Sequence, residues 1–230
     1  MNAQAGFLSK NSSTYNFKDL LADSFNGVHA PTIQKVTKGG FIYLPNKLNT
    51  NIYIIKSGRV KIGAFSDGGK EFIKLVLNDG ELFGELTLSG TDHRNEYAQA
   101  MEDTYLYVIP IRYVKNKMRT NWELNIQLTQ LMADRLILMQ QRLERQVFRD
   151  TKTRVVAFML DLIEKRGKRV GFEWLIFKFF THQEIACMTG TSRQTVTSII
   201  NELKGENLIY CNKRRLLVRD REKLSAMVNK

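Results

Sequence analysis

Residues 181–203 have the sequence THQEIACMTGTSRQTVTSIINEL, and this stretch decides how the whole chain is interpreted. Thr181 followed three residues later by Glu184 forms a capping box, which predicts the start of a helix. Ser192 is a second residue of the kind that caps a helix N-terminus. Gly190 lies between the two caps and suits a tight turn, because glycine tolerates a left-handed backbone. The stretch therefore predicts two short helices joined by a turn.

The small and apolar residues of this stretch predict how the two helices pack. Ala186 is small, as a position where two helices cross closely requires, and Cys187 beside it is expected to be a small core residue. Gly190 follows Ala186 by four residues, and Val196 and Ile199 follow the glycine by six and nine. This spacing is typical of a helix-turn-helix unit, whose second helix enters the major groove of DNA.

The outer face of the predicted second helix is polar and carries no bulky side chain. In the major groove arginine pairs with guanine, and glutamine or asparagine pairs with adenine. An ordinary solvated helix is the alternative, but the two caps and the turn glycine favour a recognition helix. The predicted base contacts are Arg193, Gln194, Thr197, Ser198 and Asn201.

A second set of residues is expected to contact the DNA backbone. Three polar residues lie at the two helix starts, where a phosphate is attracted. Further along the chain, apolar residues 208–210 and 216–218 flank a basic turn, which predicts a β-hairpin wing. A basic turn in solvent is the alternative. The predicted backbone contacts are Thr181, His182, Ser192, Lys213, Arg214 and Arg215.

The distribution of charge supports a polyanion partner for the C-terminal part. The 230 residues carry a net charge of +12. The last 80 residues hold 16 Lys and Arg against 8 Asp and Glu, whereas the first 150 hold 19 against 15. The larger surplus thus lies in the shorter part, and releasing counterions from phosphates drives nucleic-acid binding.

The stretch from Val36 to Ile111 has a different pattern, with short apolar runs separated by glycine-containing turns. The runs are residues 53–55, 60–62, 72–73, 75–77, 82–83 and 105–109, and the turns are 57–58, 67–69, 78–80 and 89–90. Glycine supplies the positive φ that tight hairpin turns require. The pattern predicts many antiparallel strands in a small barrel or sandwich.

A long helix is expected at about residues 120–148, between this β-region and a further helix at 153–165. Met132, Leu136, Met139 and Leu143 are separated by four, three and four residues, which predicts a seam for a second copy of the helix. Leu124, Leu131 and Leu138 form a stripe on another face, suited to packing on the β-region. A two-fold homodimer follows from two apolar faces. A single long core helix in a monomer is the alternative.

These observations predict an α+β chain with two domains. Residues 1–148 are expected to form the β-region with the dimerisation helix, and residues 149–230 the DNA-binding domain. Cys187 and Cys211 are too few and too far apart for a metal or disulfide framework, so neither a metal nor a cofactor is predicted. No signature of an enzyme and no membrane span is present, so we expect a cytoplasmic protein that is not an enzyme.

From about Lys35 to Val218 the chain resembles the catabolite-activator/fumarate-nitrate-regulator (Crp-Fnr) superfamily. Residues 53–61 and 83–86, with Arg94, resemble its cyclic-nucleotide-binding roll, and residues 183–186 and 190–196 resemble its DNA-reading unit. The resemblance implies an N-terminal jelly roll that senses an effector, a dimerisation helix and a C-terminal winged helix-turn-helix. It also implies a roughly palindromic double-stranded DNA site and RNA polymerase as a partner. The alternative is a nucleotide-sensing or protein-interaction module that does not act on DNA.

The sensor half departs from the family pattern for cyclic nucleotides. In the nucleotide-binding members a Gly-Glu pair holds the ribose and an Arg-Ser-Ala run holds the phosphate. Asn95 and Glu96 replace the serine and the alanine, and a carboxylate would repel a phosphate. We therefore expect an unknown effector other than cyclic AMP. The candidate pocket residues are Gly84, Glu85, Arg94, Asn95, Met139 and Gln140.

An alternative to a ligand role stays open for Gly84, Glu85 and Arg94. These residues suit the turn of the roll and an internal ion pair as well as they suit a bound nucleotide. Iron–sulfur sensing, as in the fumarate-nitrate branch, is not expected because no cysteine precedes Cys187.

Overall fold

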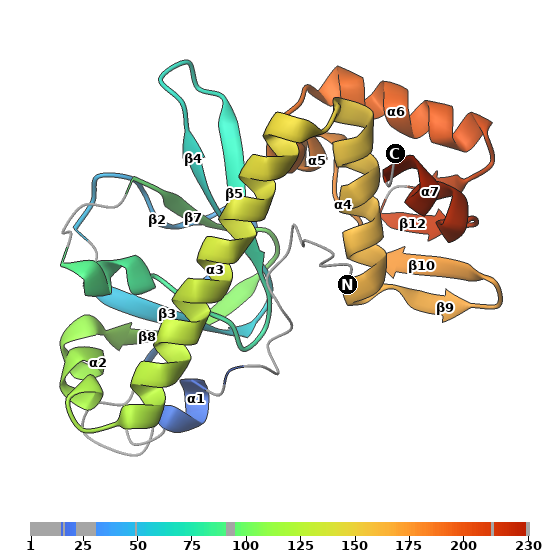
Figure 1. Ribbon diagram of the computed structural model, residues 1–230. Helices are drawn as coiled ribbons and strands as arrows, with labels where there is room; N and C mark the ends of the chain where they lie inside the picture. The colour runs from blue at the N-terminus through green and yellow to red at the C-terminus, as the bar shows by residue number, and fades with distance from the viewer. Residues whose placement is uncertain are drawn as a thin grey trace. The chain divides into compact units, whose positions relative to one another are not determined.

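The computed structural model describes residues 15, 17–21, 31–48, 50–90, 95–212 and 214–228. Its contacts divide the chain into two compact units, one that ends at Leu136 and one that begins at Ile137. The division falls inside the long helix α3 (Trp122–Phe148), coloured yellow-green to yellow in Figure 1. The domain boundary after residue 148 that the sequence suggested stays a prediction.

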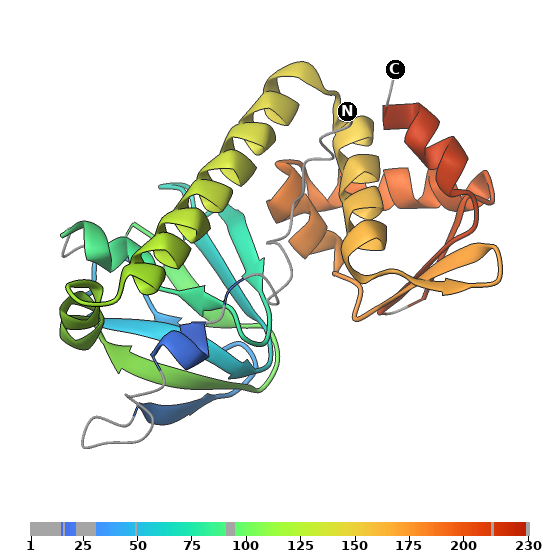
Figure 2. The ribbon, with the colours of Figure 1, turned by 60° about the horizontal axis from the view of Figure 1, so that its bottom comes forward.

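The first unit is built from two four-stranded antiparallel sheets, whose strand orders are β1-β8-β3-β6 and β2-β7-β4-β5. Each sheet combines strands from distant parts of the chain, as the predicted jelly roll requires. Figure 2 shows these strands from a second direction. The elements are α1 (Phe17–Leu20), β1 (Thr32–Val36), β2 (Phe41–Tyr43), β3 (Asn51–Ser57), β4 (Val60–Phe65), β5 (Glu71–Leu77), β6 (Leu82–Phe83), η3 (Glu85–Ser89), β7 (Tyr97–Ala100), β8 (Thr104–Pro110) and α2 (Ile111–Met118).

The predicted apolar runs correspond to strands β3, β4, β5, β6 and β8. Residues 72–73 and 75–77 belong to one strand, β5, rather than to two. Gly58, Gly69 and Gly80 have φ values of 114°, 74° and 81°, as hairpin glycines should. The turn predicted at residues 89–90 is instead the end of the 3₁₀ helix η3. Strands β1, β2 and β7 were not predicted.

The core of this unit joins the β-roll to the first half of α3. Leu124, Leu128 and Leu131 are buried in one cluster with residues of α1, β3, β6 and β8. Leu138, further along the same stripe, is also buried. The prediction that one face of the long helix is a buried stripe is therefore confirmed.

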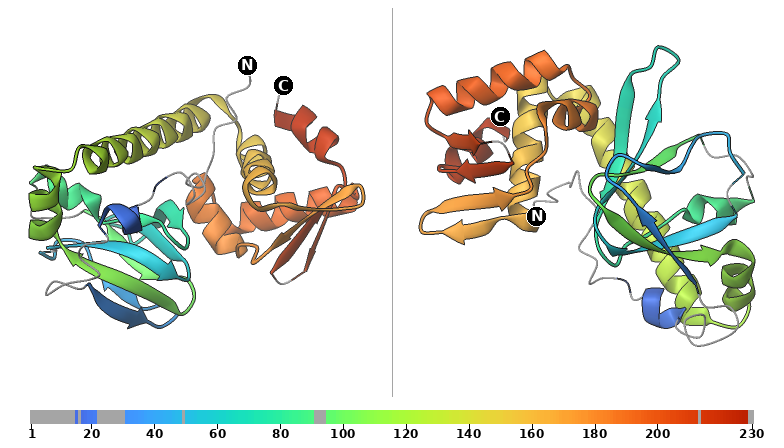
Figure 3. Two further views of the ribbon diagram at one scale, coloured as in Figure 1. Left: turned by 90° about the horizontal axis from the view of Figure 1, so that it is seen from below. Right: turned by 180° about the vertical axis from the view of Figure 1, so that it is seen from behind.

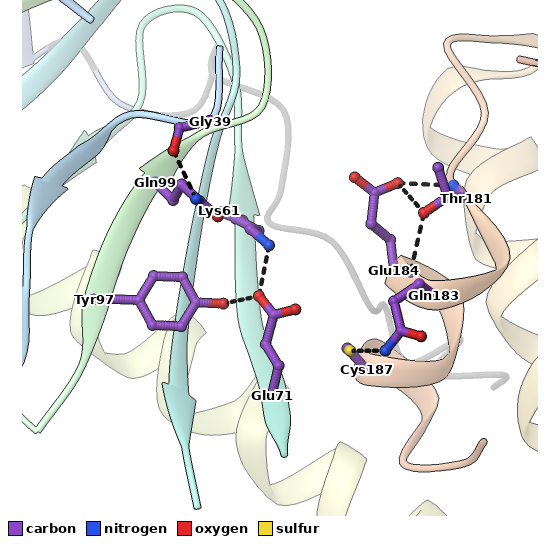
Figure 4. A network of polar contacts seen from close by, with 9 residues as sticks. All are labelled: Gly39, Lys61, Glu71, Tyr97, Gln99, Thr181, Gln183, Glu184 and Cys187. Atoms are coloured by element: carbon purple, nitrogen blue, oxygen red, sulfur yellow. Dashed lines mark hydrogen bonds and ion pairs between the residues drawn. The ribbon is translucent and has the colours of Figure 1, made fainter. Parts of the chain in front are cut away.

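A cluster of polar side chains lies on the sheet β2-β7-β4-β5. Glu71 accepts hydrogen bonds from Lys61 and from the hydroxyl of Tyr97, as Figure 4 shows. Gly63 lies directly opposite Tyr97, and a side chain there would collide with the tyrosine ring. These residues pair β4 with its two neighbours.

The second unit contains the rest of α3, four further helices and a sheet of order β11-β12-β10-β9 (Figure 3). The elements are α4 (Thr151–Arg166), β9 (Lys168–Val170), β10 (Glu173–Phe177), α5 (His182–Thr189), α6 (Arg193–Gly205), β11 (Ile209–Asn212), β12 (Arg215–Val218) and α7 (Arg221–Val228). Helix α4, the helix pair and the β11–β12 hairpin agree with the sequence. The β9–β10 hairpin was not predicted. No helix of the described residues is long and apolar enough to cross a bilayer.

Candidate nucleic-acid interface

The caps of α5 and α6 form as predicted. The hydroxyl of Thr181 accepts from the backbone N–H of Glu184, and the Glu184 carboxylate accepts from the N–H of Thr181 at 2.7 Å (Figure 4). Ser192 accepts from the N–H of Thr195 at 3.0 Å. Gly190 ends α5 with φ 67°, a left-handed backbone that favours glycine. The turn between the helices is thus fixed by local chemistry.

The two helices bury the faces that the sequence indicated. Ala186, Val196 and Ile199 are buried, and Cys187 is a buried free thiol as expected. The N–H of Thr191 donates to the carbonyl of Ala186 at 3.1 Å and ties the turn to α5. Because α6 buries one side so completely, its opposite side must face solvent.

Arg154 of α4 stabilises the turn between α5 and α6, and this role was not predicted from the sequence. Its buried guanidinium donates to the carbonyls of Thr189 at 3.0 Å, Gly190 at 3.4 Å and Arg149 at 2.8 Å. These carbonyls lie at helix ends, where backbone groups have no partner within the helix. One feature of the sequence indicates this role, an arginine placed directly before the apolar residues of α4.

The predicted base-reading side chains share the outer face of α6. Arg193, Gln194, Ser198 and Asn201 are exposed. Thr197 is only half-buried, and its hydroxyl donates to the carbonyl of Arg193 at 2.9 Å. The same oxygen lies 2.8 Å from Nδ1 of His182. Thr197 therefore orients His182, a role that the sequence did not suggest.

The contact with Thr197 bears on the tautomer of His182. The Thr197 hydroxyl donates to the carbonyl of Arg193, so a neutral His182 that bonds the same oxygen does so through an Nδ1–H. Burial, followed by the charges of Lys204 and Arg193, lowers the pKa of His182 below its usual value. In the neutral ring Nε2 is then an acceptor, so a hydrogen bond from Nε2 to a phosphate requires protonation.

The other predicted backbone contacts are positioned as follows. Thr181 and Ser192 are exposed, although their hydroxyls also serve the caps. Arg214 and Arg215 are exposed, and Arg215 begins strand β12 opposite Asn212 of β11. The guanidinium of Arg215 lies 5.5 Å from the centre of the Phe177 ring. Lys213 lies outside the described residues.

The candidate effector residues of the roll are largely engaged within the protein. Gly84 has φ 88° and precedes η3, so it makes the turn of the roll. Glu85 is buried and forms an ion pair with Arg135 of α3, whose guanidinium also donates to the carbonyl of Leu82 at 2.6 Å. The turn that the sequence offered as the alternative is present, and Glu85 has an internal ion pair whose partner, Arg135, the sequence did not indicate.

Glu96 differs from the isolated charge that the sequence suggested. Its buried carboxylate accepts from the hydroxyl of Tyr43 at 3.2 Å and pairs with Lys74 at 3.2 Å. Because Lys74 neutralises much of this charge, Glu96 would repel a phosphate less than the sequence suggested. A phosphate at this place would instead have to displace an existing ion pair.

The remaining members of the candidate pocket stay a prediction. Asn95 and Gln140 are exposed, Met139 is half-buried, and Arg94 lies outside the described residues. Met139 and Gln140 belong to the second compact unit, whereas Gly84 and Glu85 belong to the first. Among the residues that the structure describes, no group of three His, Cys, Asp or Glu side chains could hold a metal ion.

A jelly roll, a long helix and a winged helix-turn-helix with an exposed polar recognition face define a DNA-binding transcription regulator. Family models match both halves: the cyclic nucleotide-binding domain over residues 33–121 and the Crp-like helix-turn-helix domain over residues 153–227. The chain belongs to the Crp-Fnr superfamily.

Regulators that differ in their described function are equally similar in sequence to this chain. The chain is 25% identical to the global nitrogen regulator of Nostoc sp., over 84% of this chain and 87% of that protein. It is also 25% identical to a CRP-like cAMP-activated global transcriptional regulator of Mycobacterium tuberculosis, over 89% and 95% of the two chains. A CooA mutant from Carboxydothermus hydrogenoformans has a similar structure, with a TM-score of 0.76, 26% identity and coverage of 90% and 95%.

Proposed function

We propose that this regulator is a homodimer that recognises a roughly palindromic DNA site through α6 and the wing. The observation that carries the proposal is the division of α6 into a buried apolar face and an exposed face bearing Arg193, Gln194, Ser198 and Asn201. Side chains of this kind discriminate bases in the major groove. Acting on chromosomal DNA places the protein in the cytoplasm with RNA polymerase as its partner.

Arg193 is the residue expected to read a base most directly. It is the first residue of α6, directly after the Ser192 cap, and its side chain is exposed. The N-terminal end of a recognition helix is the part that lies deepest in the groove. A bidentate pair with guanine contributes about 1–3 kcal/mol of discrimination against other bases.

The decisive experiment selects bound sites from random duplexes and then varies each base pair of the selected site. Arg193→Ala should abolish preference at one position of each half-site and leave preference elsewhere intact. Arg214→Ala should weaken binding to all sequences alike and lower the salt slope by about one. A uniform loss of affinity in Arg193→Ala would make Arg193 a phosphate contact and contradict this docking.

The proposed dimer rests on a stripe of side chains along α3. Met132, Leu136 and Leu143 of the predicted seam are exposed, Leu136 by 59% and Leu143 by 66%. The exposed stripe shares Leu136 and Leu143 with the predicted seam, whereas Ala133 and Gln140 take the places of Met132 and Met139. It is also longer, and its members repeat at alternating steps of four and three residues: Trp122, Ile126, Thr129, Ala133, Leu136, Gln140, Leu143 and Val147. A second copy of the helix is the partner that fits a repeat of this period.

The stripe also suggests a different place for Gln140. It occupies one step of the repeat rather than a pocket, and a polar residue within a largely apolar seam can set the register of two paired helices. We therefore propose Gln140 as a polar pair across the two-fold axis.

For the sensor half we propose that cyclic AMP does not act as the effector. Glu85 is already paired with Arg135 of α3, and Glu96 with Lys74 of β5. Titration calorimetry with cyclic AMP should give no saturable heat at micromolar concentration. A dissociation constant in the low micromolar range would show that these ion pairs open for the ligand.

A further inference from the structure

Lys178 has an uncommon backbone conformation. Among the described residues three that are not glycine have positive φ, namely Asn46, Asn207 and Lys178, with φ 51° for the lysine. Asparagine adopts the left-handed region with comparative ease, because its short polar side chain bonds the nearby backbone. The long side chain of lysine is less suited to such a local bond, so lysine adopts this conformation at a higher cost than asparagine does. Strain of this kind persists where the surrounding structure imposes it and is common at functional sites.

The position of Lys178 lies between the two parts of the proposed DNA surface. It directly follows β10, and the buried Phe179 and Phe180 separate it from Thr181, the N-cap of α5. The N–H of Phe179 donates to the carbonyl of Arg214 at 2.8 Å. Lys178 is therefore one residue from a contact with the wing turn and three residues from the start of the helix-turn-helix.

Phe177, the residue before Lys178, has two exposed basic side chains beside its ring. Phe177 pairs with Arg215 across β10 and β12, and its ring is 45% exposed. The guanidinium of Arg215 and the ammonium of Lys168 lie 5.5 Å and 6.0 Å from the centre of that ring. Both cations are held beside the aromatic face, which lowers the entropy they lose on binding a phosphate. Lys178 itself is exposed.

The turn alone does not explain a lysine at this position. The chain must leave β10 in a left-handed conformation so that Phe179 and Phe180 enter the core. Glycine or asparagine would make the same turn with less strain. What lysine adds is an exposed positive charge between the wing and the helix-turn-helix.

We propose that Lys178 contacts a DNA backbone phosphate and joins the wing and the helix-turn-helix into one continuous surface. The inference rests on the proposed function, and it assigns a positioning contact rather than a base contact. Phosphate contacts of this kind fix the register of a protein on the duplex and contribute equally to every sequence.

The test compares Lys178→Asn with Lys178→Arg and with the exposed lysine variant Lys223→Gln on α7. Lys178→Asn keeps the turn and removes the charge. Its thermal midpoint should rise, while its affinity should fall roughly fivefold for the selected site and for random duplex alike, with the salt slope lowered by about one. Lys178→Arg and Lys223→Gln should keep the affinity and the slope of the unmodified protein.

Opposite movements of stability and affinity distinguish this proposal from a purely structural role. Unchanged affinity and slope in Lys178→Asn would overturn it, whatever happens to the thermal midpoint. A lowered midpoint with an unchanged slope would also overturn it. If the unmodified protein shifted no duplex at all, the proposed function would fail instead, so the two failures are distinguishable.

Discussion

The residues that match the family motifs are engaged within the protein in one compact unit and exposed in the other. In the β-roll, Gly84 makes a turn and Glu85 is buried in an ion pair with Arg135. In the second unit, Arg193 and Gln194 match the DNA-reading pattern and are exposed. A shared motif thus identifies corresponding positions, and burial with hydrogen bonding decides whether a side chain remains available to a ligand.

This comparison also explains why family membership does not name the effector. Relatives at 25% identity include a nitrogen regulator and a cAMP-activated regulator. The same fold of the roll occurs in relatives with both descriptions. The motif residues that this chain shares with the family, Gly84 and Glu85, stabilise the roll itself.

The largest effect is expected from opening the buried ion pair of the roll. Glu85→Ala leaves Arg135 buried without its carboxylate, which should lower the free energy of unfolding by about 3–5 kcal/mol. The double variant Glu85→Ala/Arg135→Met should recover most of the loss, because no uncompensated charge remains. Urea denaturation followed by circular dichroism measures both. A single variant as stable as the unmodified protein would mean that Glu85 is not structural.

A smaller effect is expected from charging the exposed stripe of α3. Leu136→Glu with Leu143→Glu should convert a dimer into monomers, because four carboxylates would meet across the seam. Affinity for a palindromic site should fall roughly hundredfold, since two half-sites are then bound independently. Sedimentation measures the mass and a mobility shift measures the affinity. Sedimentation of the unmodified protein as a monomer at micromolar concentration would contradict the dimer.

The smallest effect concerns the pH dependence of His182. The folded protein lowers its pKa, so the unfolded chain binds the proton more readily, and the stability due to neutral His182 is lost as pH falls below about 6.5. The negative charge of DNA phosphates near His182 should raise this pKa in the complex. DNA affinity should therefore increase severalfold from pH 7.5 to pH 5.5, and His182→Gln should flatten the curve. Equal slopes in the two proteins would exclude protonation of His182 on binding.

Local patterns made the helix-turn-helix predictable. Thr181 with Glu184, Ser192 and Gly190 act within four residues of their partners, so their spacing alone indicates the caps and the turn. The long helix was predictable for a similar reason, because Leu124 and Leu131 recur at helical spacing. The exposed polar face of α6, proposed to read bases, could be predicted from which side of the helix is apolar.

Long-range partners were not predictable from one sequence. Strand β7 has the sequence YAQA, which favours no strand by itself and forms only because β2 and β4 pair with it. The β9–β10 hairpin is short, and the basic sequence of β9 does not indicate a strand. The hairpin turn at Gly171, which has φ 61°, was therefore not recognised. Arg154 with Thr189, and Glu96 with Lys74, are partners separated by 35 and 22 residues, beyond any local spacing rule.

Each compact unit contains one of the two tryptophans of the chain, and this gives the protein its own optical labels. Trp122 begins the exposed stripe of α3 and is 76% exposed. Trp174 is half-buried on β10, with the guanidinium of Arg221 5.6 Å from its ring centre. Since indole emission shifts to shorter wavelength when water is excluded, assembly along α3 should change the Trp122 signal. Replacing one tryptophan by phenylalanine would then let the fluorescence of the other follow its own half of the molecule, without any attached dye.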